Sequence, residues 1–330
     1  MAGRTGGGCR GSAGGARMTE PAGGGRLTEA QFRELYEKLR AVPPWGPQDR
    51  RGALNYLTLD VVAAACRDVR LGRSVSMASP IGNRAAPDNP QPASHEMNSG
   101  PDAGPGTAGL VFAADQFAMN IHGDADSHLD ALCHIIYDGQ LYNGVAAAAI
   151  TAAGAMAESV AATADGIVGR GVLLDIPRLR GVPWLEPGEH VTADDLAGAE
   201  AAQNVRAGRG DLLFIRVGHR RRKLELGAWD AAASRAGLHP TALEFVAERQ
   251  IAVLGSDSNN DTAPSVADGV DFPVHVLAIN ALGVHLLDYL QFEDLVPFCE
   301  AVGHWSFLCV VAPLRIQRGT GSPVNPIAVV

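Results

Sequence analysis

The stretch His122-Gly-Asp-Ala-Asp-Ser-His-Leu-Asp-Ala-Leu-Cys-His134 gathers more acids and imidazoles than any other part of the chain. On an extended backbone, side chains two residues apart point to the same side. Four side chains are therefore expected to project together: Asp124, Asp126, His128 and Asp130. Leu129 would then face the core. Three acids and an imidazole on one face are costly to bury without a cation, so the stretch predicts a divalent-metal site.

The mixture of ligand types limits which metal this site would take. Imidazole together with carboxylate suits Zn²⁺, Mn²⁺ or Fe²⁺ better than Ca²⁺. The alternative interpretation is a polar loop whose histidines only form local hydrogen bonds, and the density of the cluster disfavours it. Taken alone, His275 fits a core histidine and Asp288 a charge on a helix surface.

Before this stretch, the chain shows one helix, one long loop and one strand. Thr28 and Gln31 form a capping box, and apolar residues recur four positions apart, so we expect a helix over 28–41. Residues 82–107 are rich in Pro, Gly, Asn and Asp and are expected to form a long loop, which is usually a lid or a subunit contact. Residues 110–121 have strand character.

After this stretch, apolar runs and helix starts alternate. Strands are expected at 171–176, 211–217, 251–255 and 307–316, and helices at 192–203 and 240–249. This order indicates a mixed α/β domain over residues 27–330.

The sequence also predicts the local structure of three further segments. The Ala-rich segment 146–157 is expected to be a helix packed in the core. The basic run 216–223 is expected to be a strand end followed by a solvated turn, which would put Arg216 and His219 at the surface. Asp257, Asn259, Asp261 and Asp268 have a spacing like that of a calcium loop, but Thr262 replaces the needed glycine. This loop is therefore expected to be structural or to form the rim of a pocket.

Composition narrows the class of protein. The chain has 330 residues, 46% hydrophobic and 19% charged, with a net charge of −9, which argues against nucleic acid as the main partner. Five scattered cysteines without a CxxC pair indicate a reducing compartment, and no apolar run is long enough to span a membrane. We therefore expect a cytoplasmic protein. Residues 1–26 are Gly/Ala/Arg-rich and are expected to be a disordered tail, in which Met18 is an alternative start to Met1.

Several motifs resemble those of the cyclase family, which includes bacterial kynurenine formamidases and isatin hydrolases. Ser127-His-Leu-Asp-Ala-Leu-Cys-His134 matches the second half of the family pattern His-x-Gly-Thr-His-x-Asp-x-Pro-x-His. The similarity to longer members spans about residues 30–330 and rests on six further segments: Trp45-Gly-Pro with Gly52-Ala-Leu-Asn55, Tyr142-Asn-Gly144, Gly169-Arg-Gly-Val-Leu-Leu-Asp-Ile176, Gly210-Asp-Leu-Leu-Phe-Ile-Arg216, Gly255-Ser-Asp257 and Gly321-Ser-Pro-Val-Asn-Pro326.

The resemblance implies roles for individual residues. His128 and Asp130 correspond to the family's paired metal ligands, and His134 stands where the family has its acid/base histidine. The distal ligand pair would be His275 and Asp288, with Asp in place of the usual Glu. The family's leading histidine falls at Asp124, which can itself bind metal through its carboxylate; His122 and Asp126 are the alternatives for this ligand.

The resemblance also implies a fold and an activity. The fold would be a swivelling β/β/α arrangement, a mixed sheet with flanking helices. One or two divalent ions, Zn²⁺ or Mn²⁺, would support hydrolysis of an amide, formamide, lactam or lactone of a small molecule. The alternatives are a cyclase or dehydratase that closes a ring, and a non-catalytic metal-binding homologue. Family members are commonly homodimers or larger, and residues 45–55 are a candidate interface.

Overall fold

A computed structural model describes residues 1, 3, 24–104 and 109–330. The helices are α1 (Glu29–Arg40), α2 (Leu59–Ala65), α3 (Ile176–Arg180), α4 (Ala193–Gln203), α5 (His219–Leu226), α6 (Ala242–Glu248), α7 (Pro273–His275) and α8 (Val296–Val302). A π-helical turn at Val276–Ala281 continues α7. Most of the tail expected at residues 1–26 lies outside the described residues.

The strands form one large sheet and three small hairpins or pairs. They are β1 (Ser74–Ser76), β2 (Ser94–Ser99), β3 (Ala114–Ala118), β4 (His128–Asp130), β5 (Ile150–Thr151), β6 (Gly154–Ala155), β7 (Ile167–Asp175), β8 (His190–Val191), β9 (Leu212–Arg216), β10 (Gly237–Leu238), β11 (Val253–Ser256), β12 (His285–Asp288), β13 (Ser306–Val311), β14 (Gly321–Pro323) and β15 (Ile327–Val329).

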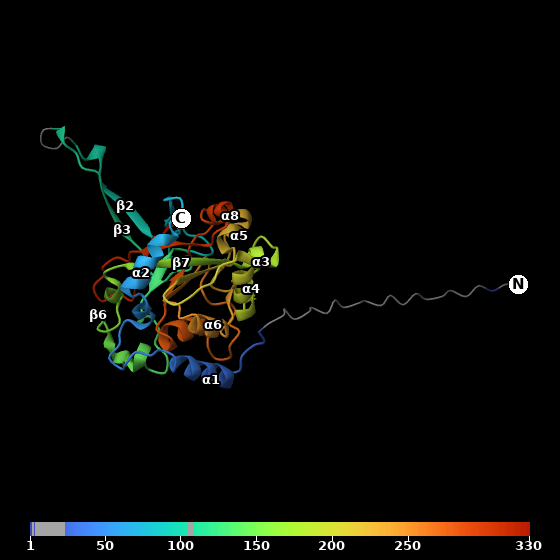
Figure 1. The fold of residues 1–330 in the computed structure, drawn as a ribbon. Helices are drawn as coiled ribbons and strands as arrows, with labels where there is room; N and C mark the ends of the chain where they lie inside the picture. The colour runs from blue at the N-terminus through green and yellow to red at the C-terminus, as the bar shows by residue number, and fades with distance from the viewer. Residues whose placement is uncertain (2, 4–23, 105–108) are drawn as a thin grey trace.

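The large sheet is mixed, and its centre is parallel. Its strand order is β1-β15-β13-β7-β9-β11-β12-β4-β14. The four strands β7, β9, β11 and β12 run parallel, and antiparallel strands extend the sheet on both sides. Parallel strands covered on both faces read as continuous apolar runs, which is why β7, β9 and β11 were visible in the sequence. The result is a curled mixed sheet flanked by helices (Figure 1), as the resemblance implied.

Each face of the sheet carries its own apolar layer. On one face, Leu213 and Ile215 of β9 pack in a cluster that includes residues of α1, α4 and α6. On the other face, Leu212 and Phe214 pack with Phe307 and Leu129. The predicted helices 28–41 and 192–203 are confirmed as α1 and α4, each with a capping box at its N-terminus. Among the described residues, none of the helices has the length and apolar character needed to cross a bilayer.

The expected long loop over 82–107 is wrong in part. Ser94–Ser99 forms β2, which pairs with β3 in a hairpin that projects from the body of the molecule (Figure 1). Both strands are exposed along nearly their whole length. A strand with both faces in water shows no apolar alternation, so the pattern used to detect strands was absent.

The basic run was also misinterpreted. His219–Leu226 forms helix α5 rather than a solvated turn, because Arg, Lys, Leu and Glu are good helix formers and Arg221 pairs with Glu225 one turn later at 2.8 Å. Arg216 is buried and ion-paired with Asp175 and Glu293, and His219 is buried as well, so the expected surface position of both residues is wrong.

Two further predictions differ from the structure: the core helix over 146–157 and the strand over 307–316. Residues 146–157 form a short 3₁₀ turn and the β5–β6 hairpin instead of a core helix. Gly154 has a φ of +103°, and a Cβ there would lie 2.7 Å from the Cβ of Arg318, so a helix cannot pass through this position. The strand expected at 307–316 ends at Val311 and is followed by β14 and β15.

Candidate metal centre

The candidate centre is built on the short strand β4. In the antiparallel register, Asp288 of β12 lies opposite His128 and Leu286 lies opposite Asp130, so all four side chains share one face. Leu129 points to the other face and is fully buried, as predicted. The expected extended backbone does not reach back to Asp124 and Asp126, because the residues before His128 form turns. Only His128 and Asp130 alternate on a strand.

Four buried side chains from three segments meet at this face. Ligand atoms of His128, Asp130 and Asp288 lie within 4.8 Å of one another. Nε2 of His275, at the start of the helical segment α7, lies 3.3 Å from Oδ2 of Asp130 and 3.4 Å from Oδ2 of Asp288. The structure therefore brings together the two distant residues implied by the resemblance and the pair on β4.

Hydrogen bonds aim both buried imidazoles at this centre. Nδ1 of His128 donates to the backbone carbonyl of Asp126 at 2.9 Å, and Nδ1 of His275 contacts the carboxylate of Asp261 at 2.6 Å. In the neutral form of each ring, with Nδ1 protonated, Nε2 would present its lone pair toward Asp130. Histidines that ligate metals usually have a carboxylate or carbonyl behind them in this way.

The loop between β11 and α7 supplies the remaining support. The carboxylate of Asp261 accepts from the backbone N–H of Val274 at 2.6 Å as well as holding His275. The side chain of Asn259 donates to Oδ2 of Asp288 at 2.7 Å, and the backbone N–H of Asn260 donates to Oδ1 at 3.2 Å. These donors keep the carboxylate of Asp288 in place. The structural interpretation of this loop is consistent with these contacts, but its link to the centre was missed.

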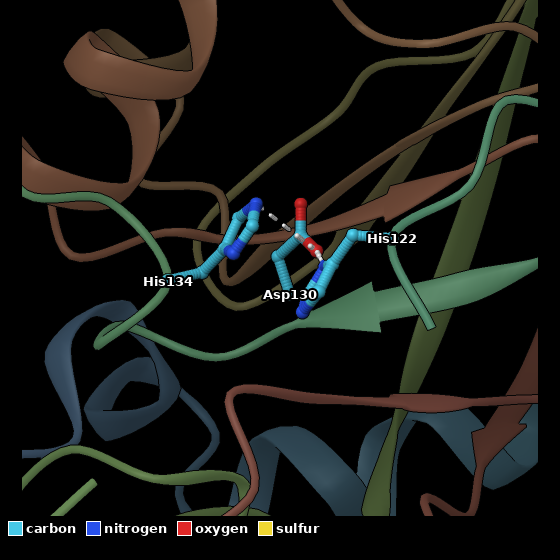
Figure 2. Close-up of side chains that lie close together, drawn as sticks. All are labelled: His122, Asp130 and His134. Carbon is cyan, nitrogen blue, oxygen red and sulfur yellow. Dashed lines mark hydrogen bonds and ion pairs between the residues drawn. The ribbon is translucent and has the colours of Figure 1, made fainter. Parts of the chain in front are cut away.

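Two partly accessible histidines cover the open side of the centre. His122 Nδ1 lies 2.7 Å from Oδ1 of Asp130, and its Nε2 lies 2.9 Å from the hydroxyl of Thr320. The ring of His134 stacks on that of His122 at 3.8 Å, with its Nε2 4.0 Å from Oδ1 of Asp130 (Figure 2). The side chain of His134 keeps 26% of its surface exposed, so a small molecule can reach it.

Of the three candidates for the leading ligand, His122 is the one whose side chain has a hydrogen bond to a member of this cluster; Asp126 contacts it only through its backbone carbonyl. The carboxylate of Asp124 accepts from the hydroxyl of Tyr289 at 2.8 Å. Oδ1 of Asp126 accepts from the backbone N–H of Gly82 at 3.1 Å. The role of Asp124 as a ligand stays a prediction.

The close packing of acids and imidazoles shifts the pKa of Asp130 downward and that of His275 upward. Burial alone would raise the pKa of Asp130, but electrostatic interaction with His134 and the close ring nitrogens of His122 and His275 outweigh burial and hold that pKa well below its usual range. Burial alone would lower the pKa of His275, but the neighbouring Asp288 carboxylate and hydrogen bonds to its acidic neighbours raise it well above its usual value. The site therefore favours ionised carboxylates around a positive charge.

One oxygen in the centre has no hydrogen-bond partner. Oδ2 of Asp130 is fully enclosed, and no described residue donates a hydrogen bond to it. A buried carboxylate oxygen left without a donor is costly, and it is the position that a cation would satisfy. With two carboxylates and two imidazole lone pairs converging, the donor set fits a divalent ion such as Zn²⁺ or Mn²⁺.

Glu158 is a buried acid outside the metal centre, next to Cys133. The backbone carbonyl of Glu158 accepts from the N–H of Cys133, while its side chain is enclosed without a hydrogen-bond partner. The closest cation contact is Arg50, whose Nε lies 3.9 Å away. Burial raises the pKa of Glu158 to about 7.

We expect this acid to make stability depend on pH. Because the pKa of Glu158 is higher in the folded chain than in the unfolded chain, stability should rise as pH falls from about 7 to about 4.5. Glu158→Gln should therefore stabilise the protein at pH 8 by about 1–2 kcal/mol and have little effect at pH 5. Thermal unfolding at both pH values, with the exposed Glu225→Gln as control, measures this; equal effects of Glu158→Gln at the two pH values would contradict it.

The fold and the centre together define an α/β protein with a carboxylate–imidazole site suited to a divalent metal. A family model described as "Putative cyclase" matches residues 44–260. A crystal structure described as a novel cyclase shares 31% sequence identity and a TM-score of 0.78, covering 89% of this chain and 99% of its own. The chain belongs to the cyclase family.

Two isatin hydrolases share the fold at lower identity. Isatin hydrolase A from Labrenzia aggregata, bound to benzyl benzoate, is 22% identical with a TM-score of 0.56, covering 78% of this chain and 93% of that one. An isatin hydrolase bound to the product analogue thioisatinate is 20% identical with a TM-score of 0.52, covering 82% and 96%. No curated protein matched the sequence significantly.

Proposed function

We propose that this protein is a metal-dependent hydrolase that cleaves an amide, formamide, lactam or lactone of a small molecule. The observation that carries the proposal is the enclosed Oδ2 of Asp130, which lacks a hydrogen-bond donor while imidazole nitrogens converge on its carboxylate. Family membership and the isatin hydrolases among the structural neighbours support the same class of reaction.

The residues that would hold the ion are His128, Asp130, His275 and Asp288, with His122 or Asp124 as a further ligand. When bound, Zn²⁺ or Mn²⁺ supplies Lewis acidity, which acidifies water and polarises a carbonyl group. The metal content per protein measured in the test below distinguishes one bound ion from two.

His134 is the residue placed to move a proton. Burial lowers its pKa to about 4, with Asp130 opposing this only in part, so the imidazole is neutral at pH 7 and has a lone pair free to accept a proton. The flat stack against His122 fixes the plane of its ring beside Asp130. His134 would take a proton from water and return it to the leaving nitrogen or oxygen.

The decisive test is a screen of purified protein supplied with Mn²⁺ or Zn²⁺. Cyclic amides, lactones and N-formyl aromatic amines should be hydrolysed, and the activity should disappear with a chelator. Preferential closure of ring-opened acids would instead identify a cyclase. Metal below about a tenth of an equivalent after supplementation, together with no turnover, would identify a non-catalytic homologue.

We also propose that the protein acts as a homodimer joined through the projecting hairpin. In the β2–β3 register, His95 lies opposite Phe117 and Met97 opposite Asp115, so Met97 and Phe117 share a face. Phe112, next to β3, is 71% exposed. An isolated two-stranded hairpin is marginally stable, and the exposed Met97, Phe112 and Phe117 need cover, although the same face also carries the His95–Asp115 ion pair.

A second copy fits this hairpin better than another partner does. At the base of the hairpin lies a groove of about 590 Å³, lined mainly by apolar residues that include Ile81, Phe117, Leu314 and Val324. The same chain thus offers an apolar arm and an apolar groove, the self-complementary pair that a two-fold dimer requires.

Charge on the arm should therefore separate the dimer. Phe112→Asp is expected to convert a dimer into a monomer in light scattering after size exclusion, because an ionised carboxylate cannot be buried in an apolar groove. Leu224→Asp, on the exposed side of α5, is the matched control and should leave the mass unchanged. A monomeric wild-type protein, or a dimer that survives Phe112→Asp, would refute this association.

A further inference from the structure

Arg235 is a buried cation without an acidic partner. Its side chain is among the largest that are fully buried, with 2% of the residue exposed. Nε donates to the backbone carbonyl of Asp261 at 3.1 Å, and Nη1 donates to the carbonyls of Ala231 and Ala232 at 3.0 and 3.1 Å. Within the described part of the chain, no carboxylate pairs with this guanidinium.

The contrast with Arg216 shows that this is unusual within the same molecule. Arg216 is buried to a similar degree but is paired with both Asp175 and Glu293. Burying a charge is unfavourable unless an opposite charge accompanies it. Arg235 thus lacks the anion that the other buried arginine has.

The place of Arg235 connects it with the metal centre. The residue that accepts its Nε–H, Asp261, is the one whose carboxylate holds His275. The ring of Phe272 neighbours both residues: its centroid is 5.4 Å from Cζ of Arg235 and 5.7 Å from the ring of His275. The guanidinium and a proposed metal ligand therefore contact the same aromatic ring.

The free donors of Arg235 belong to its Nη2 group. Nε and both hydrogens of Nη1 are used on backbone carbonyls, while Nη2 donates to no described residue and is not fully enclosed. The two free hydrogens of Nη2 diverge, so one of them can reach a carboxylate oxygen. A phosphate dianion presents more acceptor oxygens and more charge than this one nitrogen can satisfy.

Aromatic rings gather around the same place. Phe272 is 45% exposed, so its ring is open to a ligand. Trp229 donates its indole N–H to the carbonyl of Ser234, the neighbour of Arg235, at 2.7 Å. The ring of His219 lies 4.6 Å from Trp229 and 5.6 Å from Tyr289. His219 and Tyr289 are buried, so the open aromatic surface beside Arg235 belongs to Phe272, with Trp229 partly exposed.

We propose that Arg235 binds a carboxylate of the substrate, so that the substrate class is an aromatic acid carrying the bond to be cleaved elsewhere on the molecule. This inference rests on the proposed function, since it concerns the substrate of that centre. In this arrangement Phe272 supports the aromatic ring, and the carboxylate supplies the counter-ion that the fold itself does not provide. Arg235 is a specificity residue; it takes no part in proton transfer.

Benzoate and benzamide form a matched pair of probes, because they share shape and ring and differ in charge. Calorimetric titration should show benzoate binding to the wild-type protein at least about tenfold more tightly than benzamide. Arg235→Met should remove this preference, Arg235→Lys should keep part of it, and the exposed Arg315→Met should keep all of it. Phe272→Ala should weaken both probes alike.

Repeating the titration on chelator-treated protein separates this inference from the proposed function, since benzoate can also bind a metal ion. Arg235-dependent preference should persist without the ion. If no compound is hydrolysed but this preference remains, only the proposed function fails. Equal binding of the two probes to the wild-type protein, or a preference retained in Arg235→Met, overturns the inference. Should Arg235→Met not fold, Arg235→Lys is the deciding variant. Weaker benzoate binding than in the wild-type protein, with benzamide binding unchanged, supports the inference, and unchanged benzoate binding overturns it.

Discussion

Replacing His134 with alanine is expected to lower turnover by about 10²–10⁴-fold while the protein keeps its divalent ion. The reason is positional: His134 is partly exposed at the edge of the centre, and its Nε2 is 4.0 Å from Asp130, whereas the buried ligand atoms lie deeper. Turnover of the best compound from the screen and metal content by atomic spectroscopy measure the two halves of this prediction.

His304→Ala is the matched control for this variant, because His304 lies far along the chain and contacts Ser306 rather than the centre. It should leave both turnover and metal content unchanged. Loss of the ion together with activity in His134→Ala would show that His134 is a ligand. Undiminished turnover would remove it from the mechanism.

The parts of the fold that could be predicted are those in which local pattern and tertiary environment agree. The central strands β7 and β9 are buried on both faces, so an apolar run was enough to find them. Helices α1 and α4 carry capping boxes that appear in the sequence itself. The exposed strand β2 and helix α5 lack any apolar periodicity, and both were assigned wrongly.

The centre was predictable only where its residues lie close in sequence. His128 and Asp130 share a strand, so their common face followed from alternation. No local sequence pattern identifies His275 or Asp288 as ligands, and both were predicted only from the family resemblance. Asp261 was noticed as part of a calcium-like spacing, but its hydrogen bond to His275 depends on how two loops meet.

Contacts made by turns were hardest to foresee. Thr320, whose hydroxyl contacts Nε2 of His122, lies far from that residue in sequence, and no sequence pattern connects the two. Arg235, Trp229 and Phe272 come from separate loops, and each has an ordinary structural explanation when considered alone. Side chains contributed by loops acquire their role from the tertiary fold, which a periodic sequence pattern does not encode.

Asp130→Asn is expected to abolish metal binding. Ligand atoms of His122, Asp130 and His134 also lie within 4.8 Å of one another, so Asp130 belongs to this set as well as to the set with His128 and Asp288. Its carboxylate faces His122, His128 and His275. An asparagine is neutral and offers one acceptor oxygen, so it removes the charge that balances the ion. In the wild-type protein, Mn²⁺ or Zn²⁺ at a hundred times its dissociation constant should add about 2.7 kcal/mol of stability.

That stabilisation corresponds to a rise of roughly 4–5 °C in the unfolding midpoint for a domain of this size, and Asp130→Asn should show none of it. The exposed Asp294→Asn should respond to the ion like the wild-type protein. A midpoint that rises equally in Asp130→Asn would mean that the ion binds elsewhere.

The same measurement on His122→Ala and Asp124→Asn separates the two candidates for the leading ligand. His122 contacts Asp130 directly, whereas the carboxylate of Asp124 contacts Tyr289. Loss of the His122 side chain should therefore weaken the response to the ion more than loss of the Asp124 charge.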